Sequence, residues 1–234
     1  MAGFRATGNN GSFTDTFIQP GDILLQGEAV TSISGTAGTT LPATSLFTGL
    51  VNRSGPTAAF TDTIDTANNI LTGLSGGDNV NTPVLVPGST FRVRVINTTS
   101  YTETLAAGAG ITLATGVFTL SADTFRDLLF TVVNNTQQQS VVGTLSSGST
   151  LTTFALPGSS TSLPVGPSPF GLDITPGCSV SGTGIQSGTT VTALNMAQGG
   201  IIGCSLSATA TASGLSGLTF GGTIKVDSIG SGNL

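Results

Sequence analysis

The chain has 234 residues and a formal net charge of −5, with 6 basic and 11 acidic side chains and no histidine. Six cations cannot neutralise the run of phosphates on which nucleic-acid affinity depends, so we expect no nucleic-acid partner. Without histidine the chain lacks the usual general base, the usual partner of a nucleophilic serine or cysteine and the commonest zinc ligand, so we expect a non-enzymatic protein without metal or cofactor.

The composition predicts an all-β fold. Charged residues make up 7% of the chain and hydrophobic residues 38%, which excludes the highly charged, weakly hydrophobic type of disordered chain. Valine, isoleucine, leucine and phenylalanine are scattered among 40 threonines and 34 glycines, a mixture typical of short strands joined by tight turns. The first residues lack the apolar core of a secretory signal, and no window reaches the run of about 18 apolar residues that a membrane span needs. We therefore expect synthesis in the cytoplasm and no membrane partner.

Two short helices are expected in the first third of the chain. Leu46, Phe47 and Leu50 follow Pro42 at helical spacing, which predicts the first helix. The second helix is predicted after Asp65, where an apolar series at the same spacing ends before two glycines. This series consists of Ala67, Ile70, Leu71 and Leu74.

Short strands are expected from residue 91 onward. Residues Phe91–Ile96 alternate strictly, so that one face of the strand is apolar and the other carries Arg92 and Arg94. Turn residues separate further β runs at intervals of about 8 to 12 residues, a spacing typical of an antiparallel β-sandwich or jelly roll. These runs are residues 102–105, 111–113, 117–120, 125–133 and 140–145. Glycines that permit tight turns punctuate a smaller set of strands beyond residue 170.

The distribution of charge divides the chain into two β units. Sixteen of the seventeen charged residues lie outside the stretch from Leu128 to Ile224, which contains only Asp173. Serine, glycine and proline dominate the middle of the chain, which indicates a connector. The expected organisation is an extended N-terminal arm (1–40), a β-sandwich domain (41–145), a Ser/Gly/Pro-rich linker (146–169) and a small glycine-rich β module (170–234).

Three arginines are candidates for contacts between subunits. Arg92 and Arg94 share one strand face, where they can pair with acidic residues of a neighbouring subunit or form an ordinary solvated surface. Arg53 is the third candidate, because the chain has so few cations to place.

Other residues have two interpretations. Cys178 and Cys204 lie in neighbouring predicted strands, where a disulfide is conceivable, but a chain made in the cytosol more often keeps such a pair as buried thiols. Asp62, Asp65 and Asp78 can be combined into a calcium site or an acid pair. Because Asp62 and Asp65 flank a predicted helix start, helix capping is the favoured interpretation of those two.

Two regions resemble proteins of tailed-bacteriophage virions. Asp173–Leu194, Cys204–Gly214 and Leu218–Phe220 resemble a glycine-rich β module that recurs in such virion proteins. Leu46–Thr57, Phe91–Thr99 and Leu105–Leu113 resemble a second family of small, β-rich, head-associated phage proteins. Together the two regions span about half of the chain, and both are turn-and-strand patterns without chemically specific motifs.

The resemblance implies a bacteriophage virion structural protein. The leading expectation is a capsid decoration (cement) protein on the outer capsid surface, made in the host cytoplasm, which bridges subunits of the major capsid protein. A homotrimer suits the symmetry of a virion and a β module with little charge. The alternative is a tail or tail-fibre component that recognises a host surface glycan, although glycan sites normally use aromatic platforms and Tyr101 is the single tyrosine in a chain without tryptophan. A glycan depolymerase is disfavoured, because no two carboxylates stand out as an acid pair.

Overall fold

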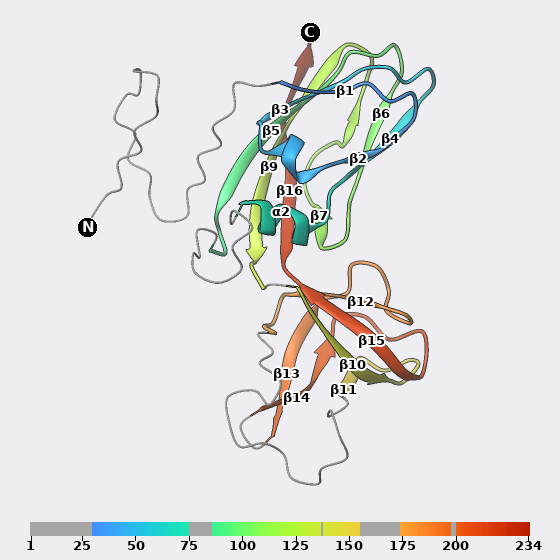
Figure 1. Ribbon diagram of the computed structural model, residues 1–234, viewed down its shortest axis with the longest axis vertical. Helices are drawn as coiled ribbons and strands as arrows, with labels where there is room; N and C mark the ends of the chain where they lie inside the picture. Colours follow the sequence, from blue (N-terminus) through green and yellow to red (C-terminus); the bar gives the residue numbers. More distant parts are fainter. Residues whose placement is uncertain (1–29, 75–85, 137, 155–173, 198–199) are drawn as a thin grey trace, which may run out of the picture.

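The computed structural model describes residues 30–74, 86–136, 138–154, 174–197 and 200–234. In these residues the expected all-β fold is confirmed, with sixteen strands and two short helices. The strands form two units, a sandwich and a barrel, which Figure 1 shows one above the other.

The first sheet of the sandwich has six strands. In spatial order they are β1 (Thr31–Ile33), β3 (Leu50–Arg53), β5 (Thr90–Asn97), β9 (Thr124–Asn134), β16 (Thr223–Asn233) and β7 (Ile111–Leu113). The central pairs β5/β9 and β9/β16 are antiparallel. The outer pairs β1/β3, β3/β5 and β16/β7 are parallel.

The second sheet has four short strands, and the two helices of the sandwich contact strands β3 and β16 of the first sheet. Its strands are β2 (Thr40–Leu41), β4 (Phe60–Ile64), β6 (Glu103–Ala106) and β8 (Thr119–Leu120). The helices α1 (Ala43–Leu46) and α2 (Ala67–Leu74) contact each other, and buried side chains from both helices and both sheets join in one apolar core. Within that core the rings of Phe91 and Phe130 stack with their centroids 4.6 Å apart.

The strand directions differ from the antiparallel sandwich that the sequence suggested. From β1 to β9 the chain alternates strictly between the first and the second sheet. Among β1 to β6 the neighbours within each sheet run parallel, as in β1/β3/β5 and β2/β4/β6, whereas β6/β8 and β5/β9 are antiparallel. Side-chain alternation defines which face of a strand is buried, but it carries no information about the direction of the neighbouring strand.

The second unit is a barrel of six antiparallel strands. In spatial order they are β12 (Ser179–Gly182), β15 (Gly214–Gly221), β10 (Gln139–Leu145), β11 (Leu151–Phe154), β14 (Gly200–Leu206) and β13 (Val191–Ala197). Beside β12 and β13, a bridge between Ser179 and Thr190 and the bond from the amide of Val191 to the carbonyl of Cys178 close the ring. Its core contains Phe154 and Phe220, whose rings meet edge to face at 5.7 Å.

The barrel is inserted into the sandwich, which corrects the expected division of the chain. β10 was expected in the sandwich but is a barrel strand, and β11 lies inside the predicted linker. β16 was expected in the C-terminal module but lies between β9 and β7 of the first sheet (Figure 1). β1, in the predicted arm, pairs with β3. These assignments depend on contacts between distant segments, which local composition does not reveal.

The returning strand β16 gives the first testable prediction. Ile224 is fully buried in the sandwich core, whereas Ile229 on the same strand is 44% exposed. Ile224→Ala should lower the free energy of unfolding by about 2–5 kcal/mol, because it leaves a cavity in the core. The matched variant Ile229→Ala should cost less than about 1 kcal/mol. Denaturant titration measures both, and equal losses would contradict the placement of β16.

Candidate functional site

Arg53 is buried, so the prediction that it contacts another subunit is wrong. Its side chain is 0% exposed, and its Nε donates a hydrogen bond to Oδ2 of Asp62. Nη1 donates to the carbonyl oxygen of Ile33 at 2.6 Å, and Nη2 donates to that of Ala37 at 3.0 Å. On β3 Arg53 shares the inward face with Val51, so strand alternation directs the guanidinium into the sandwich.

Neither Asp62 nor Asp65 caps the second helix in the expected way. Asp62 is fully buried on β4, pairs with Arg53 and accepts a hydrogen bond from the amide of Thr39 at 2.8 Å. In the first turn of α2 the hydroxyl of Thr66 instead takes the capping role, because it accepts a hydrogen bond from the amide of Asn69 at 3.2 Å.

Asp65 connects the two helices instead. One of its carboxylate oxygens accepts from the amide of Ala43 at the start of α1, at 2.9 Å. The other accepts from the amide of Thr66 and the side-chain amide of Asn69, each at 2.8 Å. Asp78, the third acid in the predicted group, lies outside the described residues.

Glu103 is a buried acid that the sequence analysis did not single out. It is 0% exposed on β6, and neither of its carboxylate oxygens has a hydrogen-bond donor within the described part of the chain. Burial and the nearby charge of Asp62 raise its pKa to about 8, while Arg53 acts in the opposite direction. A signal was present in the sequence, because Glu103 stands two residues before Leu105 on the same strand and therefore shares its buried face.

The buried cluster of Arg53, Asp62 and Glu103 can hold a proton but is closed to a substrate. All three side chains are 0% exposed, and a group that does chemistry on a substrate must reach it. Within the described ranges no group of three or more histidine, cysteine or acidic side chains is arranged to hold a metal ion.

Arg92 and Arg94 lie on the outer face of the first sheet. Arg94 forms a two-pronged ion pair with Asp127 on β9, with N–O distances of 2.7 and 2.9 Å. Its guanidinium also lies 4.1 Å from the centre of the Phe125 ring. Arg92 is exposed and has no acidic partner among the residues that the structure describes. The structure thus uses Arg94 within the chain, and contact between subunits remains a prediction for both arginines.

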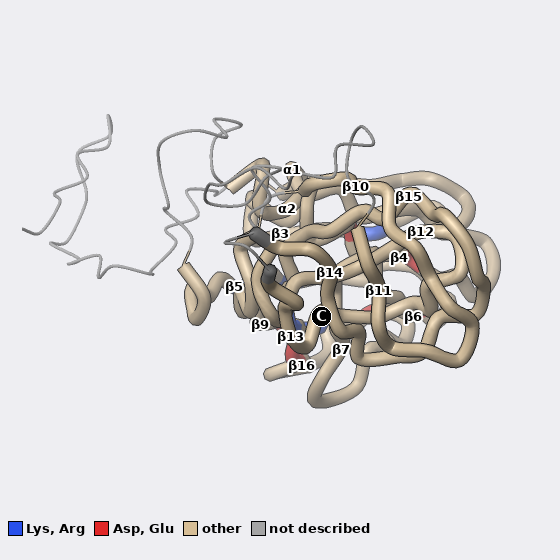
Figure 2. The backbone as a smooth tube through the Cα atoms, turned by 90° about the horizontal axis from the view of Figure 1, so that it is seen from below, with Lys and Arg blue, Asp and Glu red and all other residues tan. Residues whose placement is uncertain are grey.

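The barrel has an uncharged surface with exposed apolar side chains. No charged residue occurs in the described parts of the barrel, so the blue and red segments in Figure 2 belong to the sandwich. Val142, Leu151 and Leu215 are 47%, 56% and 73% exposed on the neighbouring strands β10, β11 and β15. Thr144 pairs with both Leu215 and Thr153, which places hydroxyl groups between the apolar side chains. We call these five residues the barrel outer face.

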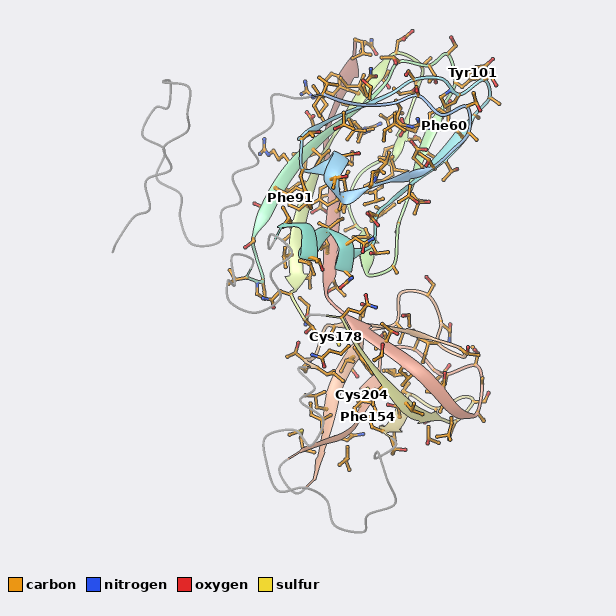
Figure 3. All side chains as sticks on the ribbon, in the orientation of Figure 1. Phe60, Phe91, Tyr101, Phe154, Cys178 and Cys204 are labelled. Carbon is orange, nitrogen blue, oxygen red and sulfur yellow. The ribbon has the colours of Figure 1, made fainter. Side chains whose placement is uncertain are left out.

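Both cysteines are free thiols in the barrel core, the alternative that the sequence favoured (Figure 3). Each is 0% exposed, and burial raises the pKa of Cys178 to about 12. Sγ of Cys204 lies 3.4 Å from the hydroxyl of Thr152. Because the thiolate is the reactive form, both side chains are chemically inert near neutral pH.

The comparisons with known proteins identify no relative. No family model, no curated protein and no solved structure matches the chain. No helix in the described part of the chain is long and apolar enough to cross a membrane.

The burial of the thiols gives a second prediction. A thiol reagent such as Ellman's reagent should react with neither cysteine in the native protein at pH 7, because both are enclosed and protonated. After denaturation without reductant, two thiols per chain should react. Fewer than two in the denatured protein would indicate a disulfide, and rapid reaction of the native protein would contradict the burial.

Proposed function

We propose that the chain is a non-enzymatic structural protein of a tailed-bacteriophage virion, in which it decorates the outer head lattice and bridges subunits of the major capsid protein. The observation that carries the binding role is the uncharged barrel outer face, set on a sandwich with its own core. The resemblance of two regions to phage virion proteins supports the assignment to a virion.

The chemistry of the barrel outer face suits a protein partner. Exposed apolar side chains release water when they are buried, which contributes about 25 cal/mol per Å² of apolar surface before the costs of association. The threonine hydroxyls between them can pair with polar groups of the partner. A face without charges forms no ion pairs, so its binding should depend little on salt.

The distribution of acids also supports a structural role over an enzymatic one. Asp62 and Glu103 form a buried acid pair, and neither side chain is exposed to a substrate. The two cysteines are enclosed as protonated thiols.

In the proposed assembly the sandwich supplies contacts between copies of the chain. Arg92 has no acidic partner within the described chain and lies on the exposed face of β5. An acidic side chain of a neighbouring copy or of the major capsid protein would satisfy it. In a homotrimer three barrels contact the lattice at the same time, so the trimer binds more tightly than a single barrel does.

The proposal predicts direct binding of the purified protein to phage heads that lack it. Leu151→Asp combined with Leu215→Asp should weaken co-sedimentation with such heads at least tenfold, because it places charges in the apolar contact. Thr104→Asp, on the exposed side of β6, is the matched control and should bind like the wild type. Binding should change little between low and high salt.

Two outcomes would overturn this function. Failure of the wild-type protein to bind heads, together with its recovery on tails, would favour the tail or tail-fibre alternative. Loss of host adsorption without the protein, with intact heads, would point the same way. If the double variant bound heads as well as the wild type, the barrel outer face would not be the contact surface.

A further inference from the structure

One cation and two acids from different sheets form a cluster inside the sandwich. Arg53 lies on β3 of the first sheet, and Asp62 and Glu103 lie on β4 and β6 of the second. All three side chains are 0% exposed. Phe60, labelled in Figure 3, pairs with Glu103 across the two strands, and its ring centre is 5.1 Å from the guanidinium carbon of Arg53.

The hydrogen bonds of Arg53 are used without Glu103. Its guanidinium binds both carboxylate oxygens of Asp62 and the backbone carbonyls of Ile33 and Ala37. Oδ1 of Asp62 in addition accepts from the amide of Thr39. The ion pair therefore attaches the end of β1 and the segment between β1 and β2, residues 34–39, to the sandwich core.

Glu103 is left in the same core, where no described residue donates to either of its carboxylate oxygens. One arginine neutralises one acid, so ionisation of both acids would leave an uncompensated negative charge away from water. A buried unpaired carboxylate is strongly unfavourable, and such groups usually take up a proton. A protonated Glu103 can donate a hydrogen bond to Asp62, which gives one of its two oxygens a partner and removes the unpaired charge.

We infer that Glu103 is a proton-binding site of the native sandwich, and that release of its proton loosens the segment between β1 and β2. The site goes beyond the proposed function and does not depend on it. On release the proton passes to solvent and the Glu103 carboxylate competes with Asp62 for Arg53. The guanidinium then has fewer donors for Ile33 and Ala37, so the segment loses part of its attachment to the core.

The direction of the pH dependence follows from the pKa of Glu103 in the two states. The value is 4.5 for the ordinary side chain and about 8 in the folded protein, where Asp62 and Arg53 are the charged groups that act on it. The folded state therefore holds a proton that the unfolded state has lost between these two pH values. This contribution to stability is complete below pH 4.5. As the pH rises from 4.5 to about 8, the folding equilibrium constant falls by up to about tenfold per pH unit, and above this range the decline ends.

Carbon-13 NMR can observe the proton site directly. The chain has two glutamates, Glu28 and Glu103, so glutamate labelled at Cδ gives two carboxyl signals, and Glu28→Gln assigns them. We expect the Glu103 signal to stay in its protonated position at pH 6.5 and to titrate near pH 8. Titration of both signals below pH 5 would overturn the inference.

The stability profile gives a second readout. Glu103→Gln keeps the shape of the side chain without a titrating proton, so the decline in stability between pH 5.5 and 8 should disappear in this variant. Asp65→Asn is the control, because Asp65 is a buried acid whose carboxylate accepts hydrogen bonds from three donors. An unchanged slope in Glu103→Gln would overturn the inference.

Hydrogen exchange tests the loosening itself. The amide of Thr39, which donates to Asp62, should lose protection between pH 6 and 8.5 after correction for the intrinsic exchange rate. The loss should be absent in Glu103→Gln, and equal protection at both pH values in the wild type would contradict the coupling.

A second variant keeps the inference testable if Glu103→Gln fails to fold. Asp62→Asn removes a charge and a hydrogen-bond partner that both raise the pKa of Glu103, and it frees Arg53 to pair with that acid. The Glu103 carboxyl signal should then titrate below its wild-type value. A signal that keeps the wild-type value would show that Asp62 does not share the proton. A gain in stability with calcium or magnesium ions at alkaline pH, without proton uptake, would replace the proton by a metal ion and overturn the inference.

Discussion

The pairing of β16 with β9 is the contact on which both units of the molecule depend. β16 is the last strand of the described chain, yet it lies in the interior of the first sheet between β9 and β7. Its buried residues Ile224 and Val226 fill the sandwich core, so the sandwich is complete only after the barrel sequence has been made. Because the barrel is inserted between two paired strands, its two chain connections lie side by side beneath the sandwich (Figure 1).

Hydrogen bonds and close packing strengthen the junction between the units. Asn134, at the end of β9, donates from its side chain to the hydroxyl of Thr175 at 2.8 Å. Thr223, at the start of β16, donates from its hydroxyl to the carbonyl oxygen of Gly177 at 3.1 Å. A Cβ at Gly222 would lie 2.7 Å from the carbonyl oxygen of Asn134, so a larger residue does not fit there. The two units therefore meet in a close, hydrogen-bonded contact that limits their relative motion.

The few charges of the chain separate its two units chemically. The sandwich contains a buried ion pair and an extra acid, and its outer face carries Arg92 and the Arg94–Asp127 pair. The described barrel strands carry no charge, so we expect the proposed contacts through the barrel outer face to respond weakly to salt and pH. Under the two proposals, binding depends on the barrel, whereas sensitivity to protons belongs to the sandwich.

The all-β class, the second helix and the strand around Phe91–Ile96 could be predicted from the sequence, because turn residues and side-chain alternation act over a few residues. The lack of charge in the barrel region was equally visible in the sequence.

The tertiary structure alone decided the parallel pairing, the place of β10 and β16, and which arginine is buried. Arg53 and Arg94 both lie on strands whose side chains alternate between the two faces of the sheet. Arg53 is buried because Asp62 faces it from the other sheet, whereas Arg94 pairs with Asp127 on the outer face. Such pairing joins residues from separate strands, and its cost or benefit depends on burial, which no local pattern specifies.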